Sequence, residues 1–264
     1  MTRKNPIGIF DSGIGGLSVL REIRKQLPDE SILYFADSSN CPYGSRNKQE
    51  TAALARKRVE FLLDRGCKLI VIACNTVTAV AIDDFRSRYD IPFVGMEPAL
   101  KPATRMTRTR KIGVLATENT FSGRLFRQTY EKYAKNVEVF AQPGYGLVEL
   151  VEQGAQDSPE AEILLQKYLT PMLKRGADTL VLGCTHYPFL MDAIQRVTCD
   201  RMAVIDPADA VAVQTRRVLA GQALLAERGD SPGYHFYTTG QAQAARSILS
   251  TALDQPYELT EISD

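Results

Sequence analysis

The sequence carries almost no excess charge of either sign. Its 264 residues include 32 basic and 31 acidic side chains, for a formal net charge of +1. A dedicated nucleic-acid-binding protein shows a strong basic excess, so we expect no nucleic-acid partner. The balance does not exclude a small anionic ligand, because a single local site can be positive on a neutral protein.

Cysteine and histidine are also scarce. Five cysteines, an odd number, stand at positions 41, 67, 74, 184 and 199, and there are two histidines. This pattern does not fit a disulfide framework, which favours a reducing cytoplasm. Because no CxxC pair occurs and histidines are few, we predict no zinc site and no bound metal.

Long apolar runs are missing. Residues 1–5 are too few and too polar for a signal peptide, and no apolar stretch approaches the length of a membrane span. We therefore expect a cytoplasmic protein with no membrane partner. The chain is 44% hydrophobic, which suffices for one large domain or for two lobes of about 100 residues or more.

Two parts of the chain resemble each other. With an offset of 110 residues, RGCKLIVIACNT from Arg65 resembles RGADTLVLGCTH from Arg175, and the cysteines at 74 and 184 coincide. Three further pairs keep the same order: IGIFDSG with IGVLATE, LYFAD with VEVFAQ, and GMEPA with VIDPA. The common order indicates duplication of one set of strand and helix units.

Strand patterns and helix patterns alternate along the chain. Short apolar runs predict strands at 7–10, 32–35, 69–73, 93–96, 112–116, 137–140, 180–183, 202–205 and 235–238. Helical periodicity predicts helices at 17–26, 49–65, 77–89, 124–134, 159–174, 190–197, 210–226 and 241–253. This alternation predicts an α/β fold with mostly parallel sheets flanked by helices, in which ligands bind beyond the carboxyl ends of the strands. Together with the repeat, it predicts two similar lobes related by internal duplication.

The duplication suggests where the lobes divide. We expect residues 1–98 plus 208–264 to form the first lobe and residues 99–207 the second. The segment 97–111 carries two prolines and a basic cluster, which predicts a solvated connection between the lobes. The chain from Asp209 on is expected to pack back on the first lobe, since chain termini often lie close together.

Cys74 and Cys184 are the first candidates for chemistry. Each alone is equally consistent with a small buried hydrophobe, but the matched positions, each followed by helix-capping residues, favour a functional pair. Ionising a thiol at pH 7 costs roughly 2 kcal/mol, of which a helix N-terminus offsets about 0.3–1 kcal/mol. One thiolate facing one thiol is therefore attainable, and it provides the base and the acid that inversion at a carbon needs.

Asp11 and the glycines that follow it form a second candidate. Asp11 ends the first strand, where a carboxylate either caps the next helix or handles a proton near Cys74. Gly13, Gly15 and Gly16 allow backbone amides to approach an anion at the start of that helix.

Further candidates lie close to the two cysteines. His186 follows Cys184 by two residues, which favours a functional role. Glu152 lies where a helical turn can place it beside that thiol and imidazole, although alone it resembles any surface glutamate. Tyr43 and Gly44 follow a proline and can offer a hydroxyl and an amide to a ligand carboxylate. The remaining cysteines look incidental: Cys41, Cys67 and Cys199.

Several motifs of the sequence resemble those of a known family, glutamate racemase, within the aspartate/glutamate racemase superfamily. The resemblance is carried by DSGIGGLSV, PYGSR, ACNT, EPALKPA, VExG at 151–154 and GCTHYP, and it spans about residues 7–207. It implies a cofactor-independent isomerase that interconverts L- and D-glutamate and supplies D-glutamate for bacterial peptidoglycan. It also implies two α/β lobes with the active site between them, and commonly a homodimer.

The resemblance assigns roles to individual residues. Cys74 and Cys184 would be the two acid/base catalysts, Asp11 would assist Cys74, and Glu152 with His186 would assist Cys184. The implied substrate contacts are Asp11, Ser12, Tyr43, Gly44, Asn75, Thr76, Thr185 and His186. The residues alone leave open which carboxylate assists which cysteine.

The chemistry agrees with this resemblance. An amino-acid α-proton is far less acidic than a thiol, so most of the barrier must fall through preorganised donors that stabilise developing negative charge in a dry cleft. No Schiff-base lysine motif appears, so we expect neither pyridoxal phosphate nor another cofactor.

Three other functions fit parts of the sequence. A Rossmann dehydrogenase fits Gly13 and Gly15, but the third glycine is Ser18 and Asp11 would crowd a pyrophosphate. A two-lobed amino-acid sensor explains the duplication but not the paired thiols. An aspartate racemase would act on a substrate that is one methylene shorter. Because a pocket discriminates one methylene by only about 1–3 kcal/mol, the choice of glutamate rests on the motifs and not on pocket size.

Overall fold

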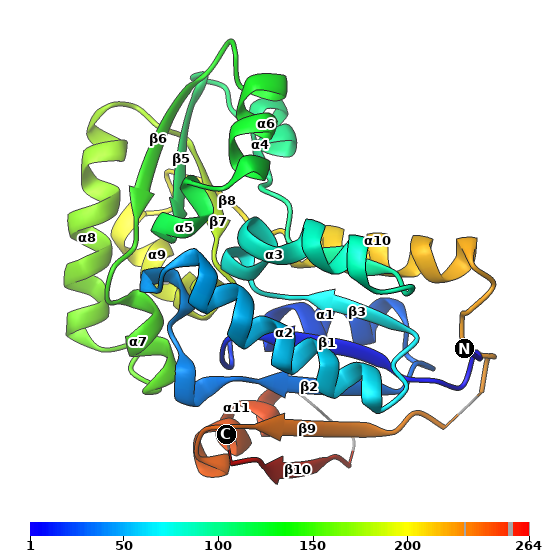
Figure 1. The fold of residues 1–264 in the computed structure, drawn as a ribbon. Coiled ribbons are helices and arrows are strands. Elements are labelled where there is room, and N and C mark those ends of the chain that lie inside the picture. Colours follow the sequence, from blue (N-terminus) through cyan, green and yellow to red (C-terminus); the bar gives the residue numbers. More distant parts are fainter. Residues whose placement is uncertain (230, 253–255, 264) are drawn as a thin grey trace.

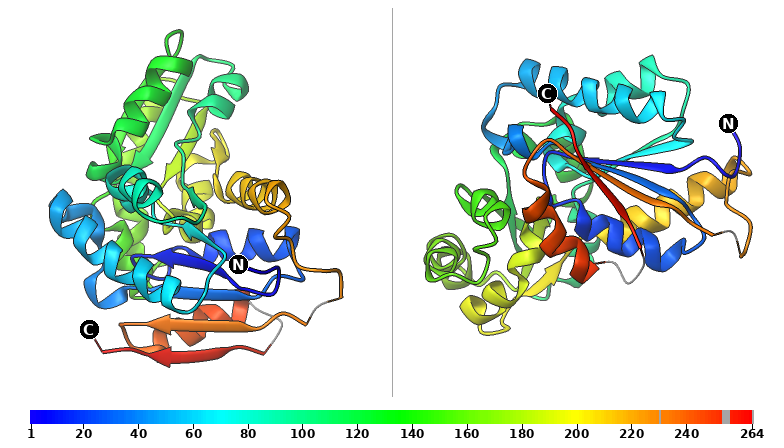
Figure 2. Two further views of the ribbon diagram at one scale, coloured as in Figure 1. Left: turned by 45° about the vertical axis from the view of Figure 1, so that its right-hand side comes forward. Right: turned by 90° about the horizontal axis from the view of Figure 1, so that it is seen from below.

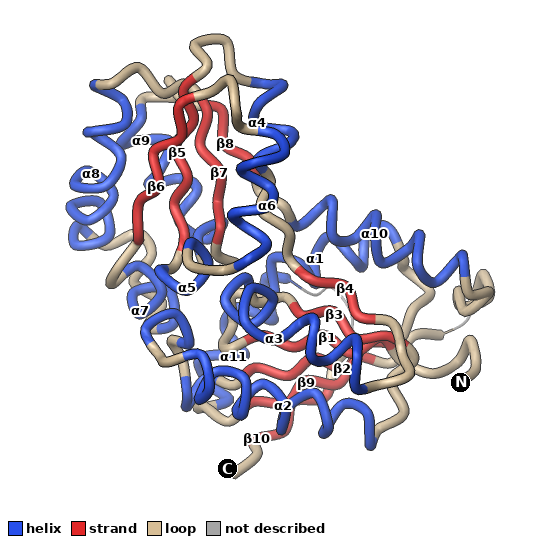
Figure 3. Tube along the Cα trace, turned by 45° about the horizontal axis from the view of Figure 1, so that its top comes forward, coloured by secondary structure: helices blue, strands red, loops and turns tan. Residues whose placement is uncertain are grey.

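The structure, a computed structural model, describes residues 1–229, 231–252 and 256–263. Within this part of the chain two separate sheets form, and every pairing between neighbouring strands is parallel (Figures 1 and 3). The predicted α/β class with two parallel sheets flanked by helices is confirmed.

The first sheet has six strands in the order β10-β9-β2-β1-β3-β4. Its strands are β1 (Ile7–Asp11), β2 (Ile32–Ala36), β3 (Leu69–Ile72), β4 (Phe93–Gly95), β9 (Tyr234–Thr238) and β10 (Glu258–Glu261). β1, β2 and β3 are buried along their whole length, as expected of apolar strands covered on both faces.

The second sheet has four strands in the order β6-β5-β7-β8. They are β5 (Lys111–Ala116), β6 (Glu138–Pro143), β7 (Thr179–Gly183) and β8 (Ala203–Ile205). This order repeats β2-β1-β3-β4 of the first sheet, strand for strand, which is the arrangement that the four repeated sequence pairs predict.

Helices cover both faces of each sheet (Figure 2). The α-helices are α1 (Leu17–Gln26), α2 (Lys48–Asp64), α3 (Asn75–Arg88), α4 (Leu100–Met106), α5 (Glu118–Phe121), α6 (Arg124–Tyr133), α7 (Leu147–Glu152), α8 (Pro159–Lys174), α9 (Met191–Thr198), α10 (Ala208–Gly221) and α11 (Ala242–Ala252). Three short 3-10 turns are η1 (Ser38–Asn40), η2 (Tyr43–Ser45) and η3 (Tyr187–Leu190). Within the described residues, no helix combines the length and apolar character that a bilayer span requires.

The C-terminal part of the chain returns to the first sheet. β9 pairs with β2, and α10 packs along α1. We propose on this basis that residues 1–98 and 208–264 make up one lobe and residues 99–207 the other.

The predicted elements match the structure closely except at five places. α4 forms inside the segment 97–111, where only a connection was expected, because Pro102 lies in the first helical turn and a proline is tolerated there. α5, α7 and β10 were also not predicted, and α10 ends at Gly221 instead of 226. Of the predicted helix 241–253, Leu253 lies outside the described residues. The four basic residues that end the connection are exposed or half-buried, as predicted: Arg105, Arg108, Arg110 and Lys111.

Candidate active site

The two cysteines of the repeat occupy equivalent positions in the two sheets. Cys74 follows β3 and is the N-cap residue of α3, while Cys184 follows β7 and precedes η3. Both side chains are buried, with 5% and 7% exposed. Ser12 lies 3.5 Å from the Cys74 sulfur, while its neighbour Asp11 accepts a hydrogen bond from Thr185, the residue after Cys184. The structure therefore brings them to one site, where the first and second sheets meet.

Cys74 is held in its protonated form by its surroundings. Burial raises the pKa of its thiol to about 12, and the negative charge of Asp11 adds to this. The amide of Val77, at the start of α3, and the Ser12 hydroxyl act in the opposite direction but are weaker. The Ser12 oxygen lies 3.5 Å from the Cys74 sulfur. At neutral pH Cys74 is thus a thiol.

Cys184 lies next to a buried ion pair. Its sulfur is 3.8 Å from Nδ1 of His186, whose Nε2 lies 2.6 Å from Oε1 of Glu152. Burial alone would lower the pKa of His186, but hydrogen bonds with Cys184, Cys41 and Glu152 hold it well above its ordinary value. Burial likewise opposes ionisation of Glu152, yet hydrogen bonding to His186 lowers the pKa of Glu152. We call Glu152 and His186 the Glu–His pair; its imidazole ring faces the Cys184 sulfur.

Asp11 is fully buried at the end of β1, between the two sheets. Its Oδ2 accepts hydrogen bonds from the Gly16 amide at 2.7 Å and from the Thr185 hydroxyl at 3.4 Å. Burial raises the pKa of Asp11 from 3.8 to about 6, although the charge of His186 lowers it. The carboxylate binds the amide at the start of α1, as one of the two sequence hypotheses expects, and the proton-handling role near Cys74 stays a prediction.

The glycine-rich loop after β1 passes directly over the Glu–His pair. A Cβ at Gly13 would lie 2.0 Å from Oε1 of Glu152, and one at Gly15 would lie 2.4 Å from Nδ1 of His186. The Ile14 amide donates to Glu152 at 2.7 Å. The anions that this loop binds are therefore two carboxylates of the protein itself, Glu152 and Asp11, and only glycine permits the approach.

Hydroxyl and amide groups complete the site. Thr185 and Asn75 are buried, and Thr76 hydrogen-bonds through its hydroxyl to that of Thr117 at 2.9 Å. Among the described residues, Oδ1 of Asn75 and Oδ1 of Asp11 are buried without a hydrogen-bond partner. Two unpartnered acceptors at one site are suited to a ligand that donates hydrogen bonds, such as an ammonium group.

Tyr43 differs from the expectation drawn from sequence. Its side chain is buried and its hydroxyl donates to the carboxylate of Asp37, which Arg58 also binds at 3.0 Å. The hydroxyl is thus engaged within the first lobe. In the turn η2, the donors that a ligand could use are therefore the main-chain amides of Tyr43 and Gly44.

Three residues near the site were not singled out from sequence. Thr117 and Asn119 come from the second lobe, and Asn119 Nδ2 donates to the carbonyl of Arg46 at 2.8 Å. The repeat contains a signal for Thr117, since it aligns with Ser12 in the pair IGIFDSG and IGVLATE. Cys41, which looked incidental, hydrogen-bonds with His186.

A small cavity adjoins the site at the junction of the lobes. It measures about 40 Å³ and is lined among others by Gly44, Thr117 and Tyr145. Because the cysteines and their neighbours are almost fully buried, a ligand reaches them only when the two lobes or their loops move apart. Closure then leaves the dry surroundings that the chemistry requires.

Sequence comparison identifies the family. The profile described as Asp/Glu/Hydantoin racemase matches residues 7–215. The chain belongs to this family. It is 47% identical over 238 residues to the glutamate racemase of Herpetosiphon aurantiacus, covering 90% of this chain and 94% of that relative.

Solved structures of the family have the same fold. The glutamate racemase of Francisella tularensis in complex with D-glutamate superposes with a TM-score of 0.86 at 30% identity, over 99% of this chain and 98% of that one. The Escherichia coli glutamate racemase in complex with L-glutamate gives a TM-score of 0.84 at 29% identity, over 98% of each chain. The family predicted from the motifs is confirmed.

Proposed function

We propose that this protein interconverts L- and D-glutamate, without a cofactor, by proton transfer between the α-carbon and two cysteines. The observation that carries the proposal is the placement of Cys74 and Cys184 after equivalent strands of two like-ordered sheets, with their thiols in one buried site. The relatives named glutamate racemase, with either enantiomer bound, support glutamate as the substrate.

The surroundings of the two thiols suit opposite roles. Cys74 rests as a thiol and serves as the acid, because its burial and the charge of Asp11 disfavour the thiolate. Cys184 serves as the base, because the imidazolium of the Glu–His pair lies beside its sulfur. Removal of the α-proton by Cys184 and delivery of a proton by Cys74 on the other face inverts the carbon. The reverse reaction exchanges the two roles.

Substrate recognition follows from the donors and acceptors of the site. The unpartnered Oδ1 atoms of Asp11 and Asn75 accept from the α-ammonium group. The substrate carboxylates are bound by hydroxyls and main-chain amides, which are supplied by Ser12, Tyr43, Gly44, Thr76, Thr185 and His186. We place Asp11 as an assistant to Cys74 through this ammonium contact and through its charge.

The carbanion-like transition state has to be stabilised by the protein itself. A thiolate alone is too weak a base for an amino-acid α-proton, so donors that are already oriented supply most of the stabilisation. Asn75, Thr76 and Thr185 are buried around the thiols, where such interactions are stronger than in water. We further propose that the D-glutamate serves peptidoglycan synthesis and that the protein acts as a homodimer in the cytoplasm.

Exchange with deuterated water tests the two-base reaction. L-glutamate is incubated with the protein in deuterated water, and the α-deuterium content of each enantiomer is followed by NMR and mass spectrometry at low conversion. We expect D-glutamate to carry deuterium while the remaining L-glutamate keeps its protium. Deuterium in both enantiomers at equal rates would indicate one base. A circular dichroism signal of L-glutamate that stays constant would indicate a binding protein. Decay of the signal with L-aspartate but not with L-glutamate would contradict glutamate as the substrate.

Substitution of the cysteines tests their roles. Cys74→Ala and Cys184→Ala should each lower kcat by about 10²-fold or more, since a positioned acid or base contributes about 10²–10⁴-fold. The exposed Cys199 serves as the control, and Cys199→Ala should keep the activity of the unmodified protein. Far-ultraviolet circular dichroism checks folding. A Cys184→Ala variant with near-normal turnover would contradict the two-cysteine assignment.

A further inference from the structure

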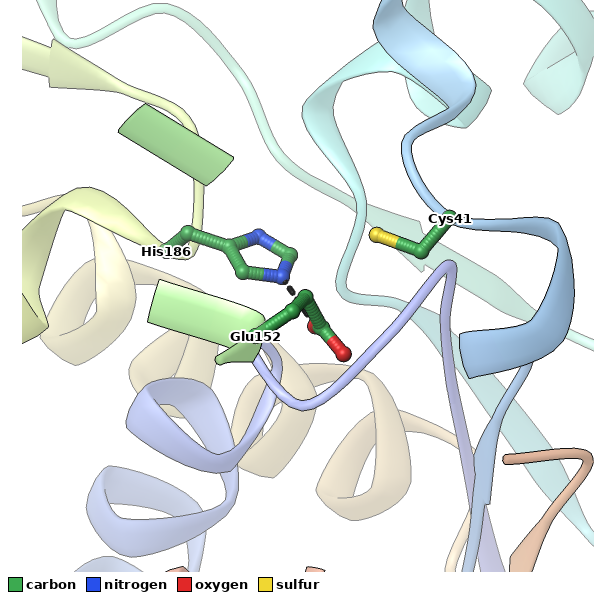
Figure 4. A group of neighbouring side chains, drawn as sticks. All are labelled: Cys41, Glu152 and His186. Carbon is green, nitrogen blue, oxygen red and sulfur yellow. Dashed lines mark hydrogen bonds and ion pairs between the residues drawn. The ribbon is translucent and has the colours of Figure 1, made fainter. Parts of the chain in front are cut away.

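Three side chains of different chemistry gather beside the Cys184 thiol. They are Cys41 from the loop before η2, Glu152 at the end of α7, and His186 just before η3 (Figure 4). The sulfur, a carboxylate oxygen and an imidazole nitrogen all lie within 4.8 Å of one another. Because the three residues come from separate parts of the chain, no spacing pattern in the sequence predicts that they lie together.

Thiolate, imidazole and carboxylate are the donors that zinc takes in proteins. Sites that bind zinc with three protein side chains leave a fourth position for water. Nε2 of His186 is the nitrogen that already faces Glu152, at 2.6 Å from its oxygen, so a metal ion would replace the proton that these two atoms share.

The loop after β1 leaves room for these donors. A Cβ at Gly13 would lie 2.0 Å from Oε1 of Glu152 and 3.1 Å from the sulfur of Cys41. Two further contacts orient the ligands: the Ile14 amide donates to Glu152, and the Cys184 sulfur contacts Nδ1 of His186. Ligands oriented by such outer contacts bind metal more tightly than free side chains.

We propose that Cys41, Glu152 and His186 bind Zn²⁺ and that the bound ion inhibits the enzyme. Binding of one Zn²⁺ displaces the thiol proton of Cys41 and the Nε2 proton of His186, and both protons leave to solvent. The ion then occupies Nε2 of His186 in place of its contact with Glu152, and the Glu–His pair no longer supports Cys184. The inhibitory part of this inference rests on the proposed role of that pair, whereas metal binding does not.

Two readouts test the site, one of them independent of activity. Isothermal titration with Zn²⁺ is compared for the unmodified protein, Cys41→Ser and Cys199→Ser, and Co²⁺ absorption reports thiolate ligation and tetrahedral coordination. We expect one ion per chain and a thiolate-to-Co²⁺ band, both retained in Cys199→Ser. Cys41→Ser should weaken binding by at least about tenfold, since even loss of a supporting contact costs about 10–100-fold in affinity.

Activity measurements separate the two parts of the proposal. Zn²⁺ should inhibit racemisation by the unmodified protein, with recovery on addition of EDTA. Measured against its own activity without metal, Cys41→Ser should need at least about tenfold more Zn²⁺ for half-inhibition. Equal Zn²⁺ binding by Cys41→Ser would show that Cys41 is not a ligand and would overturn the site. Binding through Cys41 without inhibition would leave the site intact and contradict the role of the Glu–His pair.

Discussion

At the scale of single residues, Asp11 shows a conflict between function and stability. Its carboxyl group is completely buried and its pKa is raised from 3.8 to about 6, so the folded protein holds a proton on Asp11 more tightly than the unfolded chain does. Below about pH 4 the group is protonated in both states and costs nothing. As the pH rises through about 6, the folded state must hold a buried negative charge, and the free energy of unfolding falls.

Asp11→Asn should therefore stabilise the protein at neutral pH. The gain is expected to be on the order of 2–3 kcal/mol at pH 7.5 and near zero at pH 4, because the amide keeps the bond from Gly16 but carries no charge. Urea unfolding of both proteins at the two pH values measures this difference. Racemisation should decline in the same variant. Equal stability of the two proteins at pH 7.5 would show that the buried charge is compensated.

At the scale of elements, the glycine-rich loop acts as a close cover for the Glu–His pair. Its amides bind both buried carboxylates of the site, and its missing side chains leave space for the imidazole. The sequence predicts that the glycines of this loop let its amides approach an anion. In the structure the amides of this loop do bind anions, but these anions are the protein's own carboxylates, Glu152 and Asp11.

Gly15→Ala should displace the His186 ring, because the added Cβ would lie 2.4 Å from Nδ1. A catalytic group misplaced by about 1 Å can cost about 10²-fold in rate, so we expect a loss of that order in kcat. Gly221→Ala is the matched control, since a Cβ at Gly221 meets no atom within 4 Å. Steady-state kinetics on both variants decide the question, and unchanged kcat in Gly15→Ala would show that the ring adapts freely.

Most elements could be predicted from sequence because their apolar residues repeat with the period of a strand or a helix. β10 could not, since Glu258–Glu261 is polar and lies at the sheet edge with mostly exposed side chains. The two cysteines were found through the internal repeat. Cys41 was not, because its partners lie more than 100 residues further along the chain and only the fold brings them together.

At the scale of the whole molecule, contacts between the lobes hold the site closed. Asn119, after β5, donates to the carbonyls of Tyr43 at 3.4 Å and Arg46 at 2.8 Å. Thr76 and Thr117 share a hydrogen bond from opposite lobes. These contacts lie at the mouth of the site, beside the small cavity that Gly44 and Thr117 line.

Asn119→Ala should weaken the closed arrangement without touching the thiols. Loss of its hydrogen bonds costs about 0.5–1.5 kcal/mol, which corresponds to an increase of roughly 2–12-fold in KM with little change in kcat. Small-angle X-ray scattering should give a larger radius of gyration for this variant without ligand. Gln128→Ala, an exposed change in the same lobe, should change neither quantity. A fall in kcat at constant KM would place Asn119 in the chemistry instead.

The two halves of the molecule are alike in strand order but not in the groups beside their thiols. The Glu–His pair stands behind Cys184, whereas at the position equivalent to Asp11 the second half has Ala116. The two enantiomers of an amino acid have the same energy in water, so thermodynamics requires equal kcat/KM in the two directions for the native protein and for every variant. If the different groups beside the two thiols raise kcat for one enantiomer, KM for that enantiomer must therefore rise by the same factor.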